Sequence, residues 1–163
     1  MRVGYRALQG LSGHDAGRQL LAEMYREMTG NALPEIGVTP QGKPYFLDAQ
    51  MHFSISHTDS QVFCVLSEEP VGIDAEAVDR KIDLRLAEKI LSIPEKQRYD
   101  QAADKRQALL KLFVQKEAYA KLTGRGWGNY LYETDFDPDN GAVREMHGCF
   151  VAIIDNGQLT VDS

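Results

Sequence analysis

Three short runs between residues 51 and 76 have the pattern of extended chain, and they limit the possible folds more than any other feature. The run "MHFSISH" at 51–57 alternates, with Phe53, Ile55 and His57 on one side and Ser54 and Ser56 on the other. "QVFCVLS" at 61–67 is apolar and rich in β-branched residues, and "VGIDAE" at 71–76 follows the short turn "EEP". Because connections this short join antiparallel neighbours, the sequence predicts a three-stranded antiparallel meander.

The third run carries two carboxylates in a segment that otherwise suits burial. Side chains alternate between the two faces of an extended chain, so Asp74 and Glu76 share one face while Val71 and Ile73 share the other. Like charges converge on one point only when a cation or a proton joins them. The pair is therefore a candidate site for binding a cation.

Helical patterns precede and follow these runs. Apolar residues at helical spacing predict a helix over 14–29, and the pattern becomes helical again over 83–91. A short turn begins at Pro94, and a long helix is predicted over 102–123. The expected core stripe of this long helix comprises Leu109, Leu112, Phe113, Lys116 and Ala120.

Further strands are predicted on both sides of the helical segment. "GKPYF" at 42–46 indicates a turn into a short strand, and "GCFVAIID" and "QLTVDS" near the carboxyl end flank an Asn-Gly turn. The order of elements is helix, strands, helices, strands. This order is typical of an α+β fold.

Composition narrows the class of protein. A chain of 163 residues with a net charge of −6 fits one soluble domain, and its charge argues against nonspecific nucleic-acid binding. No apolar run is long enough for a membrane span, no secretory signal is evident, and the two cysteines lie within apolar runs, so a reducing cytoplasm is expected. Residues 81–131 hold eleven Lys or Arg against six Asp or Glu, a local balance of +5 that would attract an anionic ligand or partner. A solvated helical face is the alternative interpretation.

The long helix adds a third acidic residue to the candidate site. Glu117 and Lys121 are four residues apart and share a face, which allows a simple surface ion pair. Together with Asp74 and Glu76, however, Glu117 could complete the carboxylate set of a Mg²⁺ site, with Lys121 facing phosphates of a substrate. Both interpretations are compatible with the residues alone.

Other polar residues are compatible with phosphate binding. His57, Ser56 and Lys43 all carry suitable donors, although His57 could equally be a structural histidine. The sequence has no paired-His or CxxC spacing for zinc, no P-loop or GxGxxG motif, and no GxSxG motif. These absences set aside several common classes of enzyme.

Taken in order, the four motifs "GKPYF", "FSISHT", "VGIDAE" and "FVQKEAYAKLTGRGW" closely resemble those of the 4′-phosphopantetheinyl transferases. The resemblance is to the longer surfactin-synthetase-activating type rather than to the short holo-ACP synthase type. It implies an enzyme that moves 4′-phosphopantetheine from coenzyme A to a serine of an acyl or peptidyl carrier protein and releases adenosine 3′,5′-bisphosphate. It also implies Mg²⁺, or Mn²⁺ in its place, as the cofactor, and coenzyme A as the co-substrate.

The resemblance assigns roles to the acidic residues and to Lys121. Asp74 and Glu76 match the metal-binding acids of the family's GIDxE motif, and Glu117 matches the acid of its KEA motif. Glu117 would take the proton of the carrier serine, while Lys121 would face the pyrophosphate of coenzyme A. The expected catalytic residues are therefore Glu117, Lys121 and Asp74, and the expected metal ligands are Asp74, Glu76 and Glu117.

The resemblance also implies a binding site for coenzyme A. Ser56 and His57 match the family's Ser-His pair on the phosphates, and Lys43 matches the GKP lysine at the nucleotide. Lys121 belongs to this set as well, and Arg18 is a looser match to an arginine before the family's first long helix. The chain departs from the family at position 113, where phenylalanine stands in place of the common tryptophan.

The expected architecture is one compact domain over residues 1–163, with two pseudo-symmetric halves at roughly 1–76 and 77–163. Each half would place a small antiparallel sheet on a long helix, with coenzyme A and Mg²⁺ in the cleft between them. The expected protein is a monomer that binds an acidic carrier protein and neither nucleic acid nor membrane. Two alternative functions stay open, namely a coenzyme A or nucleotide-binding protein without turnover and a Mg²⁺-dependent phosphohydrolase.

Overall fold

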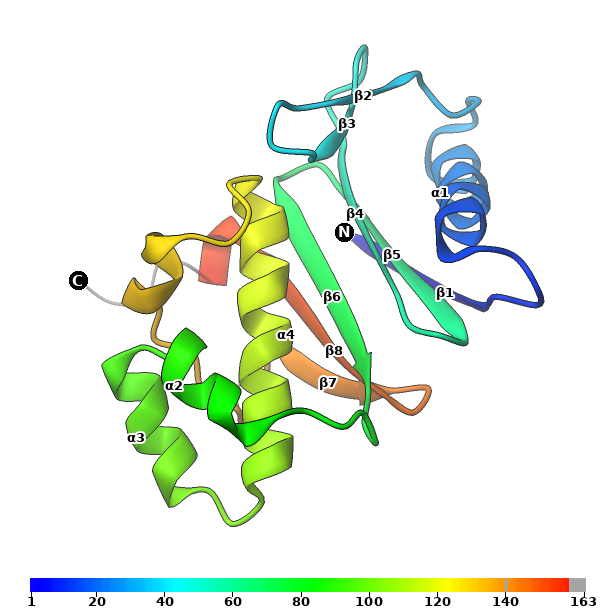
Figure 1. Ribbon diagram of the computed structural model, residues 1–163. Helices are drawn as coiled ribbons and strands as arrows, with labels where there is room; N and C mark the ends of the chain where they lie inside the picture. Colours follow the sequence, from blue (N-terminus) through cyan, green and yellow to red (C-terminus); the bar gives the residue numbers. More distant parts are fainter. Residues whose placement is uncertain (140, 159–163) are drawn as a thin grey trace.

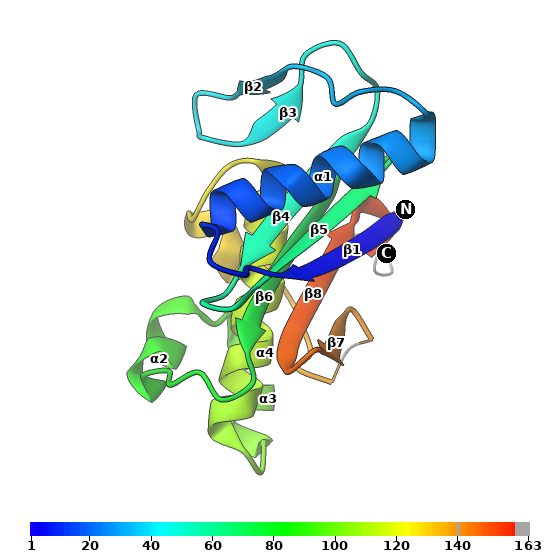
Figure 2. The same cartoon turned by 90° about the vertical axis from the view of Figure 1, so that its right-hand side faces the viewer.

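The computed structural model describes residues 1–139 and 141–158, and its centre is a pair of three-stranded antiparallel sheets packed face to face (Figure 1). The first sheet has the order β1, β5, β4, with β1 at Arg2–Ala7, β5 at Gln61–Ser67 and β4 at His52–His57. Helix α1 (Gly13–Thr29) lies across the outer face of this sheet (Figure 2).

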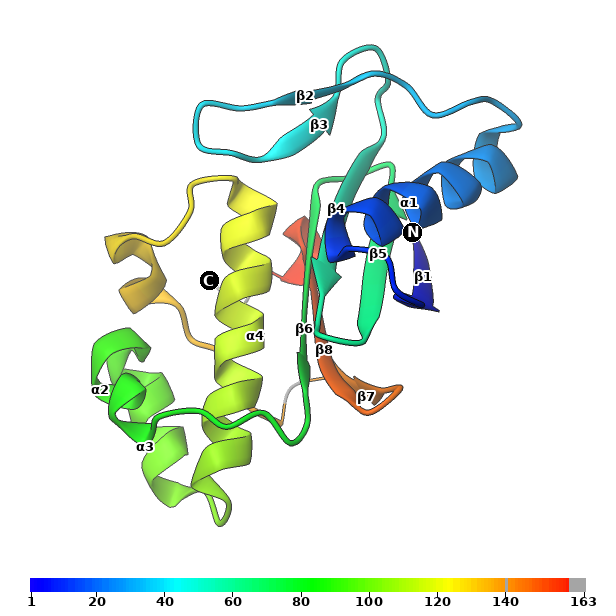
Figure 3. The same ribbon diagram turned by 45° about the vertical axis from the view of Figure 1, so that its right-hand side comes forward.

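The second sheet repeats this arrangement on the other side of the molecule. Its order is β6, β8, β7, with β6 at Val71–Ala77, β8 at Cys149–Asp155 and β7 at Val143–Met146. Helix α4 (Lys105–Thr123) packs along its outer face (Figure 3). The layers therefore run helix, sheet, sheet, helix, which confirms the predicted α+β class.

Shorter elements connect these layers. A small hairpin of β2 (Ile36–Val38) and β3 (Pro44–Phe46) lies beyond the ends of β4 and α4 (Figure 3). Between β6 and α4 come the 3₁₀ turn η1 (Leu84–Leu86), α2 (Ala87–Ile90) and α3 (Ile93–Gln101). Two further 3₁₀ turns, η2 (Asn129–Glu133) and η3 (Asn156–Gln158), follow α4 and β8. Within the described residues, no helix is both long and apolar enough to cross a membrane.

Side-chain caps explain where the helices begin and end. The α1 helix begins after Ser12, whose hydroxyl accepts a hydrogen bond from the Asp15 backbone, and Asp104 caps α4 in the same way. Both helices end at a glycine in the left-handed region, Gly30 with φ of 75° and Gly124 with φ of 68°. The predicted helix over 14–29 is confirmed, and the helix predicted from 102 begins three residues later.

The predicted three-stranded meander is wrong in its third strand. The β4 and β5 strands pair as expected, but β6 pairs with β8 in the second sheet, so residues 71–76 belong with the carboxyl-terminal elements rather than with the first 70 residues. Serine side chains make the link between β4 and β6, because the hydroxyls of Ser54 and Ser56 accept hydrogen bonds of 3.1 Å from the backbone N–H groups of Ile73 and Ala75. Alternation in a sequence specifies which side chains share a face, but it does not specify the pairing partner.

Several elements differ from the sequence expectations because their signals are short. The β1, β2 and β7 strands were not predicted, and the helix expected over 83–91 is divided between η1 and α2. The Asn-Gly pair after β8 lies in a 3₁₀ turn, and the strand expected at "QLTVDS" falls mostly on residues 159–163, outside the described residues. The hairpin partner of β8 is β7, joined to it through His147 and Gly148, which both have positive φ.

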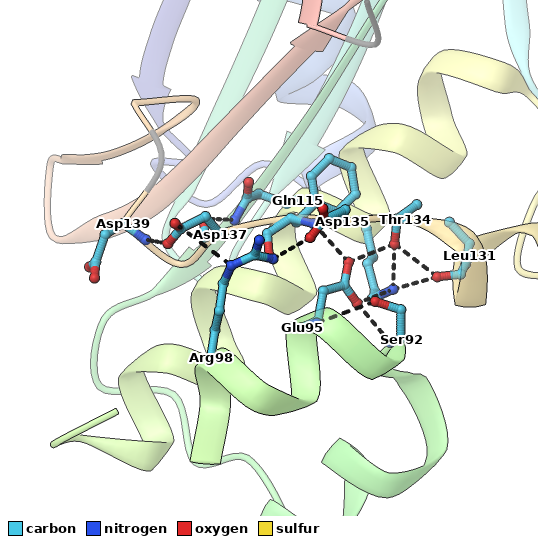
Figure 4. A network of polar contacts seen from close by, with 11 residues as sticks. Ser92, Glu95, Arg98, Gln115, Leu131, Thr134, Asp135, Asp137 and Asp139 are labelled. Atoms are coloured by element: carbon cyan, nitrogen blue, oxygen red, sulfur yellow. Dashed lines mark hydrogen bonds and ion pairs between the residues drawn. The ribbon is translucent and has the colours of Figure 1, made fainter. Parts of the chain in front are cut away.

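A buried ion pair fixes α4 against the elements on its outer side. Lys116 and Glu95 are both fully buried, with 2.7 Å between the Lys116 Nζ and Glu95 Oε2 atoms. The hydroxyl of Thr134 donates to Glu95 Oε1 at 2.6 Å, and the backbone N–H groups of Ser92 and Phe136 also donate to the carboxylate (Figure 4). Lys116 therefore lies in the core as predicted, on the side of α4 opposite to the sheet, and burial lowers its pKa.

Gly72 sets the distance between β6 and α4. A Cβ atom at this position would lie 1.9 Å from the backbone oxygen of Ala118 and 2.6 Å from the backbone nitrogen of Leu122. These contacts are with the helix backbone, which has no flexible side chain that could move away. Only glycine allows the strand and the helix to approach this closely.

We expect Gly72→Ala to lower the free energy of unfolding by about 3 kcal/mol or more, the upper end of the usual range for an overpacked core. The added methyl group must push α4 away from β6, so any activity that needs both elements should fall as well. Urea unfolding followed by circular dichroism measures the change. Gly141→Ala is the matched control, because a Cβ atom there meets no atom within 4 Å. A stability equal to that of the wild type would contradict the close packing.

Candidate active site

A cavity of about 270 Å³ opens at the carboxyl end of α4, between the two halves of the molecule. The turn before β3, the middle of β4, the last two turns of α4 and the loop that follows α4 all line it. The lining side chains with a bearing on function are Lys43, Phe53, Ile55, Glu117, Lys121 and Trp127. Residues from distant parts of the chain thus meet at one concave surface.

Asp74 lies at the centre of the polar contacts beside this cavity. It projects from β6 toward α4, where the Lys121 Nζ atom donates to its Oδ1 atom at 2.8 Å. The buried hydroxyl of Ser56 donates to the same oxygen at 3.0 Å. Within residues 1–139 and 141–158, the other oxygen, Oδ2, is buried and has no hydrogen-bond partner. A buried carboxylate oxygen without a donor is costly, and a cation would satisfy it.

The other two acidic residues lie within electrostatic reach of Asp74. Burial raises the pKa of Glu76 to about 6; the Arg80 guanidinium, which forms an ion pair with it, opposes the shift, and the negative charges of Asp74 and Glu117 add to it. Burial also raises the pKa of Glu117, although a hydrogen bond of 2.6 Å from the Trp127 Nε1–H group opposes the increase. The charge of Asp74 raises the Glu117 pKa further. The charge of Asp74 therefore makes both Glu76 and Glu117 harder to ionise, as expected for a cation site.

The carboxylates have partners other than one another. Lys121 forms an ion pair with Asp74, and Arg80 forms one with Glu76, whereas Trp127 donates a hydrogen bond to Glu117. No group of three or more His, Cys, Asp or Glu in the described part of the chain is already arranged around a common metal position. The residues still fit a divalent ion, because the free Oδ2 atom of Asp74 is an oxygen ligand, and because burial and, to a smaller extent, the charge of Asp74 raise the pKa of both Glu76 and Glu117. The surface ion pair that was the simpler interpretation of Glu117 and Lys121 is absent from the described contacts, because Lys121 reaches across to β6.

Lys43 joins the β2–β3 hairpin to the end of α4. Its Nζ atom donates to the backbone oxygen of Leu122 at 2.6 Å, and its carbon chain packs against Gly124. Burial lowers the pKa of this lysine. Lys43 thus places positive charge at the same end of α4 as Lys121.

The remaining residues expected to bind coenzyme A lie beside the cavity rather than in its lining. Ser56 is buried behind Asp74, and His57 is exposed, with its ring against Gly13 at the start of α1. Arg18 lies on α1 with its guanidinium 5.9 Å from the centre of the Phe53 ring, which itself lines the cavity. The structure therefore groups Lys43, Glu117 and Lys121 directly and places Arg18 and His57 toward the α1 side.

Sequence reasoning missed two residues that hold the acids. Arg80 forms the ion pair with Glu76, and its guanidinium lies 5.2 Å from the centre of the Phe113 ring. Trp127 donates to Glu117 and stacks on Phe113. The available signal for Trp127 was the segment "GRGWG", in which glycines flank the chain's single tryptophan directly after the long helix. Arg80 had no comparable signal.

Comparison with known proteins shows the family of the chain. Residues 70–153 match the 4′-phosphopantetheinyl transferase superfamily, so the chain belongs to this family and the resemblance inferred from its four motifs is confirmed. The chain is 39% identical over 87 residues to the 4′-phosphopantetheinyl transferase gsp of Aneurinibacillus migulanus. The matched region covers 52% of this chain and 36% of that protein. It is 34% identical over 119 residues to the 4′-phosphopantetheinyl transferase psf-1 of Bacillus pumilus. This second matched region covers 67% of this chain and 47% of that protein. The chain thus spans less than half of the length of each of these relatives.

Proposed function

We propose that this chain transfers 4′-phosphopantetheine from coenzyme A to a serine hydroxyl of an apo acyl or peptidyl carrier protein. One observation carries the proposal: in a chain of this family, Lys121 and Glu117 line the cavity between the two halves, and Asp74 lies directly behind Lys121 with one carboxylate oxygen unsatisfied. Phosphoryl transfer needs such a combination of negative ligands for a cation and positive charge for phosphates.

Asp74, Glu76 and Glu117 would hold a Mg²⁺ ion, with Mn²⁺ as a substitute. When bound, the ion would neutralise charge on the pyrophosphate of coenzyme A and so favour departure of its nucleotide portion. The unsatisfied oxygen of Asp74 and the effect of its charge on the pKa of Glu76 and of Glu117 support this assignment. The pairing of Asp74 with Lys121 keeps that lysine close to the position that the phosphates would occupy.

Side chains of this protein can then carry out the proton removal and support the phosphoryl transfer. Glu117 takes the proton of the carrier serine, and its raised pKa makes the carboxylate a stronger base. The serine oxygen attacks the β-phosphorus of coenzyme A, the bond from that phosphorus to the bridging oxygen breaks, and adenosine 3′,5′-bisphosphate leaves. Lys121 offsets the negative charge that develops on the phosphates during this step.

Coenzyme A would extend from the cavity toward α1. Lys43 would lie at its nucleotide, while His57 and Arg18 would contact phosphates on the α1 side of the cavity. Ser56 would act indirectly in this arrangement, because its hydroxyl donates to Asp74 and its oxygen accepts from the β6 backbone. An acidic carrier protein would approach the segment 81–131, whose local charge is positive. A monomer in a reducing cytoplasm stays a prediction from the sequence.

The test is to incubate the protein with coenzyme A, Mg²⁺ and an apo carrier protein and to weigh the carrier by mass spectrometry. We expect the carrier to gain one phosphopantetheine group and adenosine 3′,5′-bisphosphate to appear in equal amount. Chelation of divalent ions with EDTA should reduce the rate to background, and added Mg²⁺ or Mn²⁺ should restore it.

The same experiment separates the alternatives. Release of phosphopantetheine without any carrier protein would indicate a Mg²⁺-dependent phosphohydrolase. Binding of coenzyme A without either product would indicate a binding protein without turnover. Either result, obtained across acyl and peptidyl carrier proteins, would overturn the proposed transfer.

A further inference from the structure

Trp127 is the single tryptophan of the chain, and its indole lies against the face of α4 that carries Glu117. The Nε1–H group donates to the Oε1 atom of Glu117 at 2.6 Å. The ring also stacks on Phe113, one helical turn earlier, with 6.1 Å between ring centres and 25° between ring planes. Two contacts on the same face of one helix therefore determine the position of the indole.

The loop that carries Trp127 is itself held in place. Gly124 and Gly126 both have φ of 68°, and these two left-handed residues turn the chain back toward α4 after the helix ends. The Tyr130 hydroxyl donates to the backbone oxygen of Gly126 at 2.5 Å, and the guanidinium of Arg125 lies 4.0 Å from the centre of the Tyr130 ring. The indole is thus supported by the loop on one side and by Phe113 on the other.

The hydrogen bond from Trp127 leaves the charge of Glu117 intact. A lysine or arginine in the same place would neutralise the carboxylate, whereas an indole N–H group is a donor without charge. The nearest cation on the same helix face, Lys121, is engaged with Asp74 at 2.8 Å and is not paired with Glu117. Oε1 is therefore fixed by a neutral donor. Among residues 1–139 and 141–158, no hydrogen bond or ion pair engages Oε2, so this oxygen can accept a proton or a cation.

We infer that Trp127 is a positioning residue for Glu117, holding one carboxylate oxygen so that the other faces the reacting groups. The inference rests on the proposed function for the task of Glu117, but the contact itself can be tested without any transfer reaction. Because a glutamate side chain has three rotatable bonds, loss of the donor should let the carboxylate sample orientations that do not react.

The contact is tested by ¹⁵N–¹H correlation spectroscopy of the free protein. The chain has one tryptophan, so its spectrum contains a single indole N–H signal that needs no assignment. We expect Glu117→Ala to move this signal upfield and to speed its exchange with water. Glu133→Ala, which removes an exposed carboxylate six residues after Trp127, is the matched control and should leave the signal in place. An unchanged indole signal in Glu117→Ala would overturn the inference.

The role in the reaction is tested by steady-state kinetics of carrier modification. Trp127→Phe keeps a ring on Phe113 and removes the donor, so kcat should fall by about tenfold to a hundredfold while KM for coenzyme A changes by less than about threefold. Trp127→His, which retains an aromatic N–H group, should recover part of the loss. Tyr132→Phe, at an exposed aromatic residue of η2, should leave kcat unchanged.

The outcomes separate the inference from the function on which it rests. A kcat within twofold of wild type in Trp127→Phe would overturn the positioning role. The same conclusion would follow if Trp127→Phe and Trp127→His lost kcat equally while their unfolding midpoints stayed unchanged. If the Phe variant does not fold, the indole signal of Glu117→Ala decides. A moved indole signal in a protein that modifies no carrier would support the contact and overturn the proposed transfer.

Discussion

Asp74→Asn is expected to lower the rate of carrier modification by about a thousandfold or more while the fold is retained. Asparagine has nearly the same shape, and its oxygen can still accept the hydrogen bond from Ser56. The substitution removes the negative charge that holds Lys121 and that would bind the cation. The rate is measured by mass spectrometry at saturating coenzyme A and Mg²⁺, with circular dichroism as the check on folding.

Asp79→Asn is the matched control for this experiment. Asp79 is an exposed carboxylate just after the end of β6, so its loss should leave the rate close to that of the wild type. If Asp74→Asn stays within tenfold of the wild-type rate, Asp74 is not required for transfer and the cation site must lie elsewhere. If it unfolds, Asp74 serves chiefly to satisfy Lys121 and Ser56.

Lys116→Met is expected to lower the free energy of unfolding by about 3 to 5 kcal/mol, because it leaves the Glu95 carboxylate buried without a counter-charge. Both side chains are fully buried, so water cannot take over the role of the lysine. Backbone donors from Ser92 and Phe136 remain, but hydrogen bonds from neutral groups do not cancel a buried charge. Urea denaturation measures the loss.

Two further variants separate burial from charge in this result. Lys96→Met removes a lysine whose ion pairs with Glu88 and Asp100 are partly exposed, so it should lower the free energy of unfolding far less than Lys116→Met does. The double substitution Lys116→Met with Glu95→Gln should recover much of the loss, because no uncompensated charge remains. If Lys96→Met and Lys116→Met lowered the free energy of unfolding equally, the buried ion pair would contribute no more to stability than an exposed one.

The two long helices of this protein and its β4–β5 hairpin were predictable because their signals are local. Caps at Ser12 and Asp104 and terminal glycines define α1 and α4 within a few residues of the chain, and turn length alone joins β4 to β5. The strand β6 has an equally clear pattern but not an equally local partner. Its neighbour β8 lies more than seventy residues further along the chain, and nothing in the pattern of "VGIDAE" indicates it.

The candidate site was likewise predictable only where its signals are local. Periodicity was sufficient to place Asp74 beside Glu76 on one face of a strand, and Glu117 with Lys121 on one face of a helix. The partners of these side chains follow from the packing of β6 on α4, which depends on the close approach that Gly72 allows. Trp127 reaches Glu117 only because two glycines turn the chain back onto the helix.

The sequence alone determined the two long helices, most of the strands, the faces of the side chains and the family. The tertiary structure decided that β6 joins the second sheet, that Lys121 binds Asp74 rather than Glu117, and that Lys116 binds Glu95 across the outer side of α4. The physical reason is the range of the interactions involved. Helix and strand propensities act over a few neighbouring residues, whereas pairing between distant charged groups is settled only when burial of the whole core fixes the distances between elements.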